Sequence, residues 1–451
     1  MGRVLKLERR AEGRARETGE AAPPASLEPG GERPWETAAL DELDFTSLAY
    51  QENPAPWLHR IRCESPVFLT RHGHWLLTRY VDVKRALRDP RFSSDWSRLR
   101  GIPTGNSTEA RNRRLVFESF NMKDPPAHTR LRALVNLAFA GLAAERRRGR
   151  IEALARELLE RRAGGTDLCV VEDFGFHLPI IVAAEMIGIP AEDRLHFRSL
   201  FEDAELLFLP DRTPEQEERG RRALAEEIRY VRALVAERRH ERRDDLISEL
   251  VRARTPEGAL TEDEIVSAVV TIFTAAGTTT ERLISSGILA LLQHPDQLSR
   301  LRAEPRLIDS AVEEILRWHH PDQATSTPRW TTEAVRVGNV ILPQHATVRL
   351  SLGAANRDPE HFPDPDRFDI TRAPNRHLAF GRGEHFCLGA TLARMEARIA
   401  LRTIIEQHPQ IELLTRKPHR DPRRPDRYAK ILVRLGEPLP ASRRDASRRE
   451  P

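Results

Sequence analysis

The chain has 451 residues, of which 39% are hydrophobic and 31% charged, and its formal net charge at pH 7 is +4. This composition predicts a globular protein with enough apolar material for a sizeable core. Because basic and acidic residues are nearly balanced and no zinc-finger or RNA-recognition signature accompanies them, nucleic acid is not expected as a partner.

The cysteines and the apolar runs indicate the cellular compartment of the protein. Cys63, Cys169 and Cys387 lie far apart and form no Cys-x-x-Cys pair, which argues against a disulfide framework or a cysteine-built zinc site and fits a reducing cytoplasm. No apolar run reaches the roughly 20 residues of a membrane span, and the polar N-terminus lacks the core of a signal peptide. We therefore expect a cytoplasmic protein without a membrane anchor.

The chain is expected to form one domain between two tails. Residues 1–36 and 437–451 have the composition of disordered segments, and no long linker interrupts residues 37–436. Most of this domain shows the apolar spacing of helices, with charged opposite faces. The clearest helical stretches are 140–162, 215–242 and 298–318.

Short alternating stretches predict a small β region. Two hairpins are expected, one from 67–69 with 75–78 and one from 335–341 with 347–352. The predicted fold class is therefore mainly α with a small β region.

A helix that opens near Asp124 carries two cationic groups on one face. His128 and Arg132 are four residues apart, so both side chains project in the same direction. Such a pair is able to grip a carboxylate.

The longest predicted helix lies in the middle of the chain. Thr261 and Glu264 form a capping-box start, and His294-Pro295 is a plausible stop. The helix between them would be about 50 Å long at roughly 1.5 Å per residue. Its first half, 265–276, is almost wholly apolar, so we expect it to be buried.

This central helix contains a stretch that is costly for a helix. Residues 275–281 read Ala-Ala-Gly-Thr-Thr-Thr-Glu, and glycine and β-branched residues weaken a helix interior. Threonine hydroxyls can also bond the carbonyl four residues back and open the helix locally. Two interpretations stay open here, a functional groove and close packing of Gly277 against a neighbouring helix.

The most informative segment is the loop FGRGEHFCLG at 380–389. Its glycines allow a close approach to a flat ligand, and a helix-forming run begins directly after Cys387. Amide groups and the dipole at that helix start favour a thiolate, which serves as a metal ligand or a nucleophile. The alternative is a buried structural cysteine in a glycine-rich turn.

The loop resembles the cysteine loop of the cytochromes P450, in which the thiolate ligates haem iron. The pattern Phe-Gly-x-Gly-x-His-x-Cys-x-Gly is matched at every specified position, and the order of elements from about Trp57 to about Leu435 is similar to that of soluble bacterial members. The resemblance implies the cytochrome P450 fold, with a long central helix over the haem and a proximal cysteine loop.

The resemblance also implies roles for individual residues. Cys387 would be the metal ligand, and Thr280, Gly277 and Ala276 would form the catalytic oxygen site, with Thr280 as a proton-relay alcohol. The implied haem-binding residues are His128, Arg132, Arg329, Phe380, Gly381, His385 and Gly389. A structural network of Glu314, Arg317 and Arg367 would lock the proximal face, and the substrate pocket would include Phe201, Ile272, Ala324 and Thr325.

One departure from the family pattern concerns proton delivery. The residue before the relay threonine is usually Asp or Glu, and here it is Thr279. Glu281 follows one residue later, but that step turns the side chain by about 100° around the helix, so Glu281 is not assumed to substitute.

The implied function is that of a haem-thiolate monooxygenase. It would insert one oxygen atom of O2 into a C–H or C=C bond of a medium-sized, mainly apolar organic substrate, using heme b (iron protoporphyrin IX). Because the chain holds no cysteine set for an iron–sulfur cluster, electrons from NAD(P)H would arrive through a separate ferredoxin and ferredoxin reductase. Basic residues near the loop, Arg382, Arg394 and Arg398, would meet an acidic carrier, or simply face solvent.

Two other functions stay open. A haem-free family member could act as an allosteric or scaffolding partner, although such a protein is expected to lose the cysteine or the carboxylate grip. A peroxygenase would keep the haem and use hydrogen peroxide, which the missing acid before Thr280 permits. We expect a monomer, and both natural-product tailoring in secondary metabolism and xenobiotic oxidation are compatible with the sequence.

Overall fold

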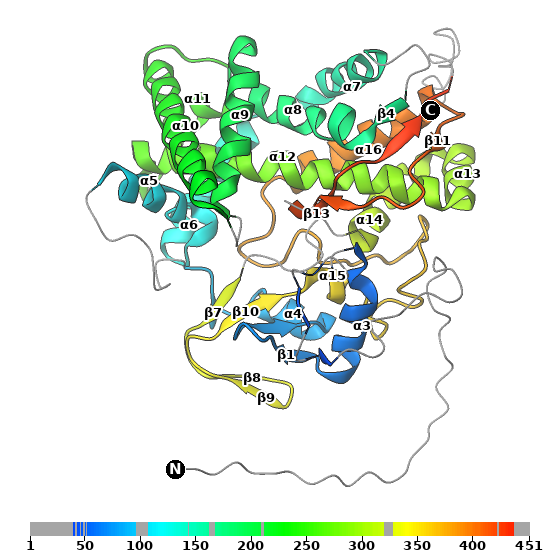
Figure 1. Cartoon of the computed structure of the whole chain (residues 1–451). Coiled ribbons are helices and arrows are strands. Elements are labelled where there is room, and N and C mark those ends of the chain that lie inside the picture. Colours follow the sequence, from blue (N-terminus) through cyan, green and yellow to red (C-terminus); the bar gives the residue numbers. More distant parts are fainter. Residues whose placement is uncertain are drawn as a thin grey trace, which may run out of the picture. The chain divides into compact units, whose positions relative to one another are not determined.

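The long central helix is present as α12 (Glu262–Gln293) and runs through the helical part of the fold (Figure 1). The computed structural model describes residues 39–40, 43–45, 47, 50, 52–95, 107–142, 144–161, 167–208, 212–319, 328–421 and 424–436. The predicted tails, 1–36 and 437–451, lie outside these residues. Thr261 caps α12 as predicted, because its hydroxyl accepts from the Glu264 amide at 3.2 Å and the Glu264 carboxylate accepts from the Thr261 amide at 2.8 Å.

The other helices pack around α12 or beside the sheets. Within the described residues they are α3 (Pro54–Glu64), α4 (Tyr80–Ala86), α5 (Thr108–Phe117), α6 (Ala127–Gly141), α7 (Ala144–Glu160), α8 (His177–Ile187), α9 (Arg194–Ala204), α10 (Pro214–His240), α11 (Leu246–Arg252), α13 (Pro295–Ala303), α14 (Ile308–Trp318), α15 (Leu352–Ala355) and α16 (Ala390–Gln407). Helix α12 contacts α8, α10 and α16 most extensively.

Two of the predicted helical stretches are interrupted. The stretch 140–162 joins the end of α6 to α7, which begins at Ala144. The stretch 298–318 is divided at Pro305, which starts a short 3₁₀ turn between α13 and α14, because proline lacks the amide that a continuing helix needs. The stretch 215–242 is confirmed as α10.

The strands form small sheets in the described part of the chain. They are β1 (Val67–Leu69), β2 (Trp75–Leu77), β3 (Phe92–Ser93), β4 (Asp167–Cys169), β5 (Arg254–Thr255), β6 (Gly258–Ala259), β7 (Arg329–Thr331), β8 (Val335–Val337), β9 (Val340–Leu342), β10 (Thr347–Leu350), β11 (Glu412–Leu413), β12 (Arg420–Asp421), β13 (Arg424–Tyr428) and β14 (Leu432–Arg434). The largest sheet has the order β1-β2-β10-β7-β3.

The first hairpin prediction is confirmed and the second is wrong in its pairing. Strands β1 and β2 are antiparallel, with Val67 opposite Leu77. Strand β8 instead turns at Gly338, whose φ of 55° is left-handed, and pairs with β9. Strand β10 runs parallel to β2 and antiparallel to β7, a long-range pairing that local alternation cannot reveal.

Three apolar cores are found among the described residues, and the smallest lies around α3. The largest core lies among the helices from α5 to α14 and α16, and a second core joins the five-stranded sheet to α4. Within the described residues, no helix combines the length and apolarity that crossing a membrane requires.

Candidate functional site

The cysteine loop is held in shape by its own backbone. The Cys387 amide donates to the Phe380 carbonyl at 3.0 Å, and the Gly381 amide donates to the Leu378 carbonyl at 2.8 Å. Gly381 and Gly383 have φ values of 69° and 79°, a conformation that side chains disfavour. A Cβ on Gly383 would also lie 2.8 Å from the Leu87 carbonyl oxygen, so only glycine fits there.

The start of α16 favours the thiolate form of Cys387, as predicted, but burial of the thiol has the larger effect on its pKa. Although water reaches part of the residue, the surrounding protein raises the pKa of the thiol. A hydrogen bond from the Gly389 amide, at the N-cap of α16, and the charges of Arg132 and Arg394 oppose this effect without overcoming it. Since a coordinating metal ion deprotonates a thiol, the residue is suited to a metal ligand rather than to a free nucleophile.

Four predicted cationic or donor side chains converge beside this loop. His128, on α6, lies with its ring centroid 4.2 Å from that of His385. Arg132, one turn further along α6, donates from Nη2 to the Phe386 carbonyl at 2.7 Å. Arg329, on β7, is buried and is close enough to influence the pKa of His385.

The local environment opposes positive charge on these groups. Burial, followed by the charges of Arg329, His128 and Arg132, lowers the pKa of His385 to about 3. Burial also lowers the pKa of Arg329 to about 10, against a smaller effect of Asp124. A cluster of this kind is stabilised by any anionic group that enters it.

The ring of His128 supplies a direct test of whether a carboxylate-bearing cofactor fits. The residue is only 2% exposed, and neither ring nitrogen has a hydrogen-bond partner in the described part of the chain. A buried polar group without a partner costs about 1–3 kcal/mol, so native structures rarely leave one. The residues around the cysteine loop therefore fit a flat cofactor with carboxylate groups, such as haem.

The threonine-rich stretch stays helical in the structure. The hydroxyls of Thr274 and Thr279 donate to the carbonyls of Val270 and Ala275, at 2.9 and 2.7 Å. The predicted bonds to the preceding turn are thus confirmed, but α12 is continuous through them rather than opened. Thr280 is buried, whereas Thr279 is exposed.

Packing against a neighbouring helix is what the structure shows for Gly277. A Cβ at this position would lie 3.0 Å from Cδ1 of Ile180 on α8 and 3.9 Å from the ring of Phe201 on α9. Ala276, next to it, is half-buried. Gly277 therefore lets α12 approach α8 closely, and its role in an oxygen site stays a prediction.

Glu281 is directed toward the following turn of α12. It is 1% exposed, and its Oε1 accepts from the Ser285 hydroxyl at 3.0 Å. The acid that follows Thr280 in sequence is thus engaged with Ser285, in agreement with the expectation that it does not simply replace an acid at position 279.

The structural network contains the predicted buried acid, but the prediction that Arg367 pairs with it is wrong. Glu314 and Arg317 are fully buried on α14 and form two hydrogen bonds of 2.8 Å. The side chain that joins them is Arg372, whose Nε lies 3.3 Å from Glu314. Arg367 is exposed and contributes only its carbonyl oxygen, which accepts from Arg317 at 3.2 Å and from Arg372 at 3.0 Å.

The predicted substrate-pocket residues are only partly described. Phe201 and Ile272 are 1% and 5% exposed, and the Phe201 ring makes an edge contact with Phe273 at 5.4 Å between centroids. Ala324 and Thr325 lie outside the described residues. Their part in a pocket stays a prediction.

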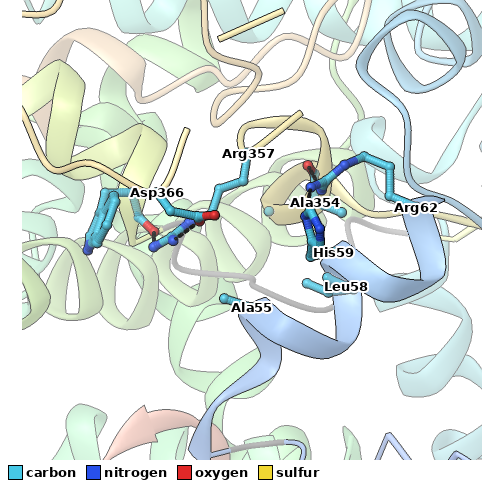
Figure 2. A pocket seen from close by; sticks show the side chains of 9 residues that line it. Ala55, Leu58, His59, Arg62, Ala354, Arg357 and Asp366 are labelled. Atoms are coloured by element: carbon cyan, nitrogen blue, oxygen red, sulfur yellow. Dashed lines mark hydrogen bonds and ion pairs between the residues drawn. The ribbon is translucent and has the colours of Figure 1, made fainter. Parts of the chain in front are cut away.

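A small cavity lies elsewhere, between α3 and the chain after β10. In Figure 2, Arg62 and His59 lie on one side of it and the ion pair of Arg357 and Asp366 on the other. The pair is 2.7 Å apart, and Arg62 Nη1 donates to the Ala354 carbonyl at 2.9 Å. The cavity volume of about 10 Å³ holds about one water molecule, so an organic substrate does not fit.

Some residues around the loop were not singled out from the sequence. Besides Arg372, Asn375 donates to Glu314 at 3.1 Å, and Asp124 accepts from the Ser94 amide at 2.8 Å. These residues lie in irregular segments, where no periodic pattern marks a buried partner. Among the described residues, no group of three His, Cys, Asp or Glu side chains is placed to hold a metal ion.

Comparison with known proteins agrees with this geometry. The family model described as cytochrome P450 matches residues 211–425. The chain is 41% identical over 343 residues to cytochrome P450 107B1 of Saccharopolyspora erythraea, which covers 75% of this chain and 83% of the relative. It is 38% identical to 6-deoxyerythronolide B hydroxylase of the same organism, over 77% of this chain and 86% of that protein.

A solved structure shares the fold over most of its length. The crystal structure of P450BioI in complex with an acyl carrier protein ligated to hexadec-9Z-enoic acid superposes with a TM-score of 0.79 at 32% identity, and the match covers 86% of this chain and 99% of that one. The chain therefore belongs to the cytochrome P450 family: it is a haem-thiolate monooxygenase that oxidises an organic substrate with dioxygen and with NAD(P)H-derived electrons from redox partners.

Proposed function

We propose that Cys387 would ligate the haem iron and that His128, Arg132, Arg329 and His385 would hold the haem carboxylates. The observation that carries this assignment is the buried ring of His128, whose two nitrogens have no partner beside a glycine-rich cysteine loop. When bound, haem supplies the chemistry of dioxygen activation, which a thiolate ligand favours by donating electron density.

The residues of the loop have distinct tasks in this proposal. Gly381 and Gly389 leave room for the flat cofactor, and Phe380 accepts the amide of Cys387 and so fixes the direction of the sulfur. Arg132 ties α6 to the loop through the Phe386 carbonyl, which orients the two walls of the site relative to each other. Glu314, Arg317 and Arg372 brace the segment that leads into the loop.

On the other side of the site, α12 provides the side chain that transfers protons. The Thr280 hydroxyl relays protons to the reacting oxygen, and the small side chains of Ala276 and Gly277 leave space there. Because Thr279 replaces the usual acid and Glu281 is engaged with Ser285, water delivers protons to Thr280.

Replacing Thr280 by alanine is expected to keep haem binding and to uncouple electron flow from product. Positioned proton transfer contributes roughly 10²–10⁴-fold, so product formed per electron consumed should fall about tenfold or more, since water compensates in part. The measurement is product and hydrogen peroxide per NAD(P)H oxidised. Thr278→Ala, two residues earlier on α12, is the control, and unchanged coupling in Thr280→Ala would remove the relay role.

For the redox partners we propose a small ferredoxin and a ferredoxin reductase in the cytoplasm, with this chain acting as a monomer through one domain, 37–436. Of the three arginines suggested for docking, Arg394 pairs with Glu313 at 2.6 Å and Arg398 with Asp309 at 2.7 Å, whereas Arg382 is exposed. Arg382 is therefore the strongest docking candidate of the three.

For the substrate we propose a medium-sized, mainly apolar organic molecule that meets Phe201, Ile272, Ala324 and Thr325. The buried apolar side chains on α9 and the apolar first half of α12 support this class. So does the kinship with proteins described as a 6-deoxyerythronolide B hydroxylase and as a myristic acid complex of CYP267B1. A spectral-shift screen of a diverse compound library, which reports displacement of water from ferric iron, identifies the compound class.

The monooxygenase reaction itself is tested by the source of oxidant. With a screened compound as substrate, turnover with ferredoxin, reductase and NAD(P)H is expected to exceed turnover with hydrogen peroxide. The opposite result, with peroxide alone giving the faster reaction, would establish the peroxygenase alternative.

A further inference from the structure

A partly buried ion pair joins two helices directly behind the cysteine loop. Arg394 of α16 donates from Nε to Glu313 Oε1 at 2.6 Å and from Nη2 to Oε2 at 2.9 Å, with Glu313 on α14. This paired geometry fixes the plane of the guanidinium as well as its position. Figure 1 shows α14 and α16 in the same helical part of the fold, and the two helices are in contact.

His377 completes this group with a defined tautomer. The Ala379 amide donates to Nδ1 of His377 at 3.1 Å, so Nδ1 carries no proton. The proton is therefore on Nε2, which donates to Glu313 Oε2 at 3.0 Å. Burial opposes ionisation of Glu313, but the hydrogen bonds from His377 and Arg394 lower its pKa to about 2, so it is a carboxylate at neutral pH.

The same arginine lies over the aromatic ring of the loop. The Arg394 guanidinium carbon is 4.4 Å from the ring centroid of Phe380, within the range of a cation–π contact. The carbonyl of Phe380 accepts the amide of Cys387 at 3.0 Å. A chain of contacts therefore runs from Glu313 through Arg394 and Phe380 to the cysteine backbone.

We propose that Glu313, His377 and Arg394, here called the proximal clamp, are positioning residues that hold Phe380 and thereby keep the Cys387 sulfur directed at the haem iron. The clamp contacts the chain at two neighbouring residues, Ala379 and Phe380, where the cysteine loop begins. His377 anchors the Ala379 amide, and Arg394 covers the Phe380 ring. The inference rests on the proposed role of Cys387 as the ligand.

A docking role for Arg394 makes a different prediction. If the guanidinium served an acidic redox partner, removal of its charge would weaken partner binding and removal of the Glu313 charge would strengthen it. In the clamp, both changes break the same pair and loosen the loop in the same direction. One substitution that removes the positive charge of Arg394 and one that removes the negative charge of Glu313 therefore distinguish docking from positioning.

The test uses the haem-loaded protein with Arg394→Gln, Glu313→Gln and Arg394→Lys. The matched control is Arg398→Gln, one turn further along α16, because Arg398 pairs with Asp309 at 2.7 Å. Two quantities are measured: hydrogen–deuterium exchange of the amides in 380–389, and the rate at which mild urea destroys the red-shifted carbon monoxide band of the reduced protein.

Each clamp variant is expected to speed amide exchange and loss of the band by about three- to tenfold. This factor corresponds to the free energy of one partly exposed ion pair and one cation–π contact. Arg398→Gln should match the parent protein. The double variant Arg394→Gln with Glu313→Gln should be no worse than either single variant, because both substitutions break the same interaction. Arg394→Lys keeps the charge but loses the planar stack, so it should behave like Arg394→Gln.

Exchange and band-loss rates of Arg394→Gln and Glu313→Gln that equal those of Arg398→Gln would overturn the clamp. Opposite changes in partner affinity with unchanged exchange would assign Arg394 to docking instead. If Arg394→Gln fails to fold, Glu313→Gln and Arg394→Lys decide the question. Failure of the ligand assignment is separate, since it would show as a band retained after loss of Cys387 and not as altered exchange.

Discussion

Cys387→Ala is expected to abolish the red-shifted carbon monoxide band of the reduced protein. That band reports a thiolate bound to the haem iron, and an alanine side chain offers no ligand. The loop keeps its shape, because the Cys387 amide bond to the Phe380 carbonyl does not use the side chain. The measurement is a difference spectrum of the reduced protein with and without carbon monoxide.

Cys63→Ala is the matched control for this experiment. Cys63 is also exposed, but it lies on α3, whose buried residues belong to a separate apolar cluster from the helices that form the site. We expect it to retain the full band and the full haem content. A red-shifted band that survives in Cys387→Ala would show that another residue is the ligand, and the proposed site would then be wrong.

Glu314→Gln is expected to lower the free energy of unfolding by about 3–5 kcal/mol. The carboxylate is 0% exposed and accepts from Arg317, Arg372 and the Asp369 amide. Glutamine has nearly the same volume, but it leaves the buried Arg317 guanidinium without its counter-charge. The cost arises because an unpaired buried charge cannot recover its hydration.

Urea unfolding of the haem-loaded protein, followed by circular dichroism, measures this loss. The control is Glu406→Gln, which breaks an exposed pair with Arg402 on α16, where both side chains are more than 40% exposed. Such surface pairs contribute about 0–1 kcal/mol. If Glu314→Gln cost no more than Glu406→Gln, the buried network would not stabilise the fold in the way proposed.

Local chemistry explains which parts of the fold could be predicted from the sequence. The cap at Thr261 and the stop at His294 depend on residues that are close in sequence. Both ends of α12 were therefore predicted to within a residue. Pairing that depends on distant segments was not predictable in this way. Strand β10 finds its partners in β2 and β7, which lie far from it in sequence, and alternation alone placed it in a hairpin.

In the candidate site, too, contiguous motifs were predicted correctly and some contacts between distant segments were not. The cysteine loop is a contiguous motif, and the four cationic or donor groups predicted around it do converge in the structure. The third arginine of the buried network was misplaced by five residues, because Arg367 and Arg372 stand in irregular chain where no period tells which side chain turns inward. The packing of Gly277 against Ile180 likewise required the position of α8.

The unpartnered imidazole of His128 has a consequence for how the protein matures. It lies beside His385, whose lowered pKa of about 3 keeps that ring neutral at neutral pH, and near Arg329, which carries a positive charge. In the proposed site, the porphyrin carboxylates would contribute to the folding free energy, and haem loading would stabilise the native state by mass action. Cells that synthesise the polypeptide faster than the pigment should accumulate a looser chain, open to proteolysis around α6 and the start of β7.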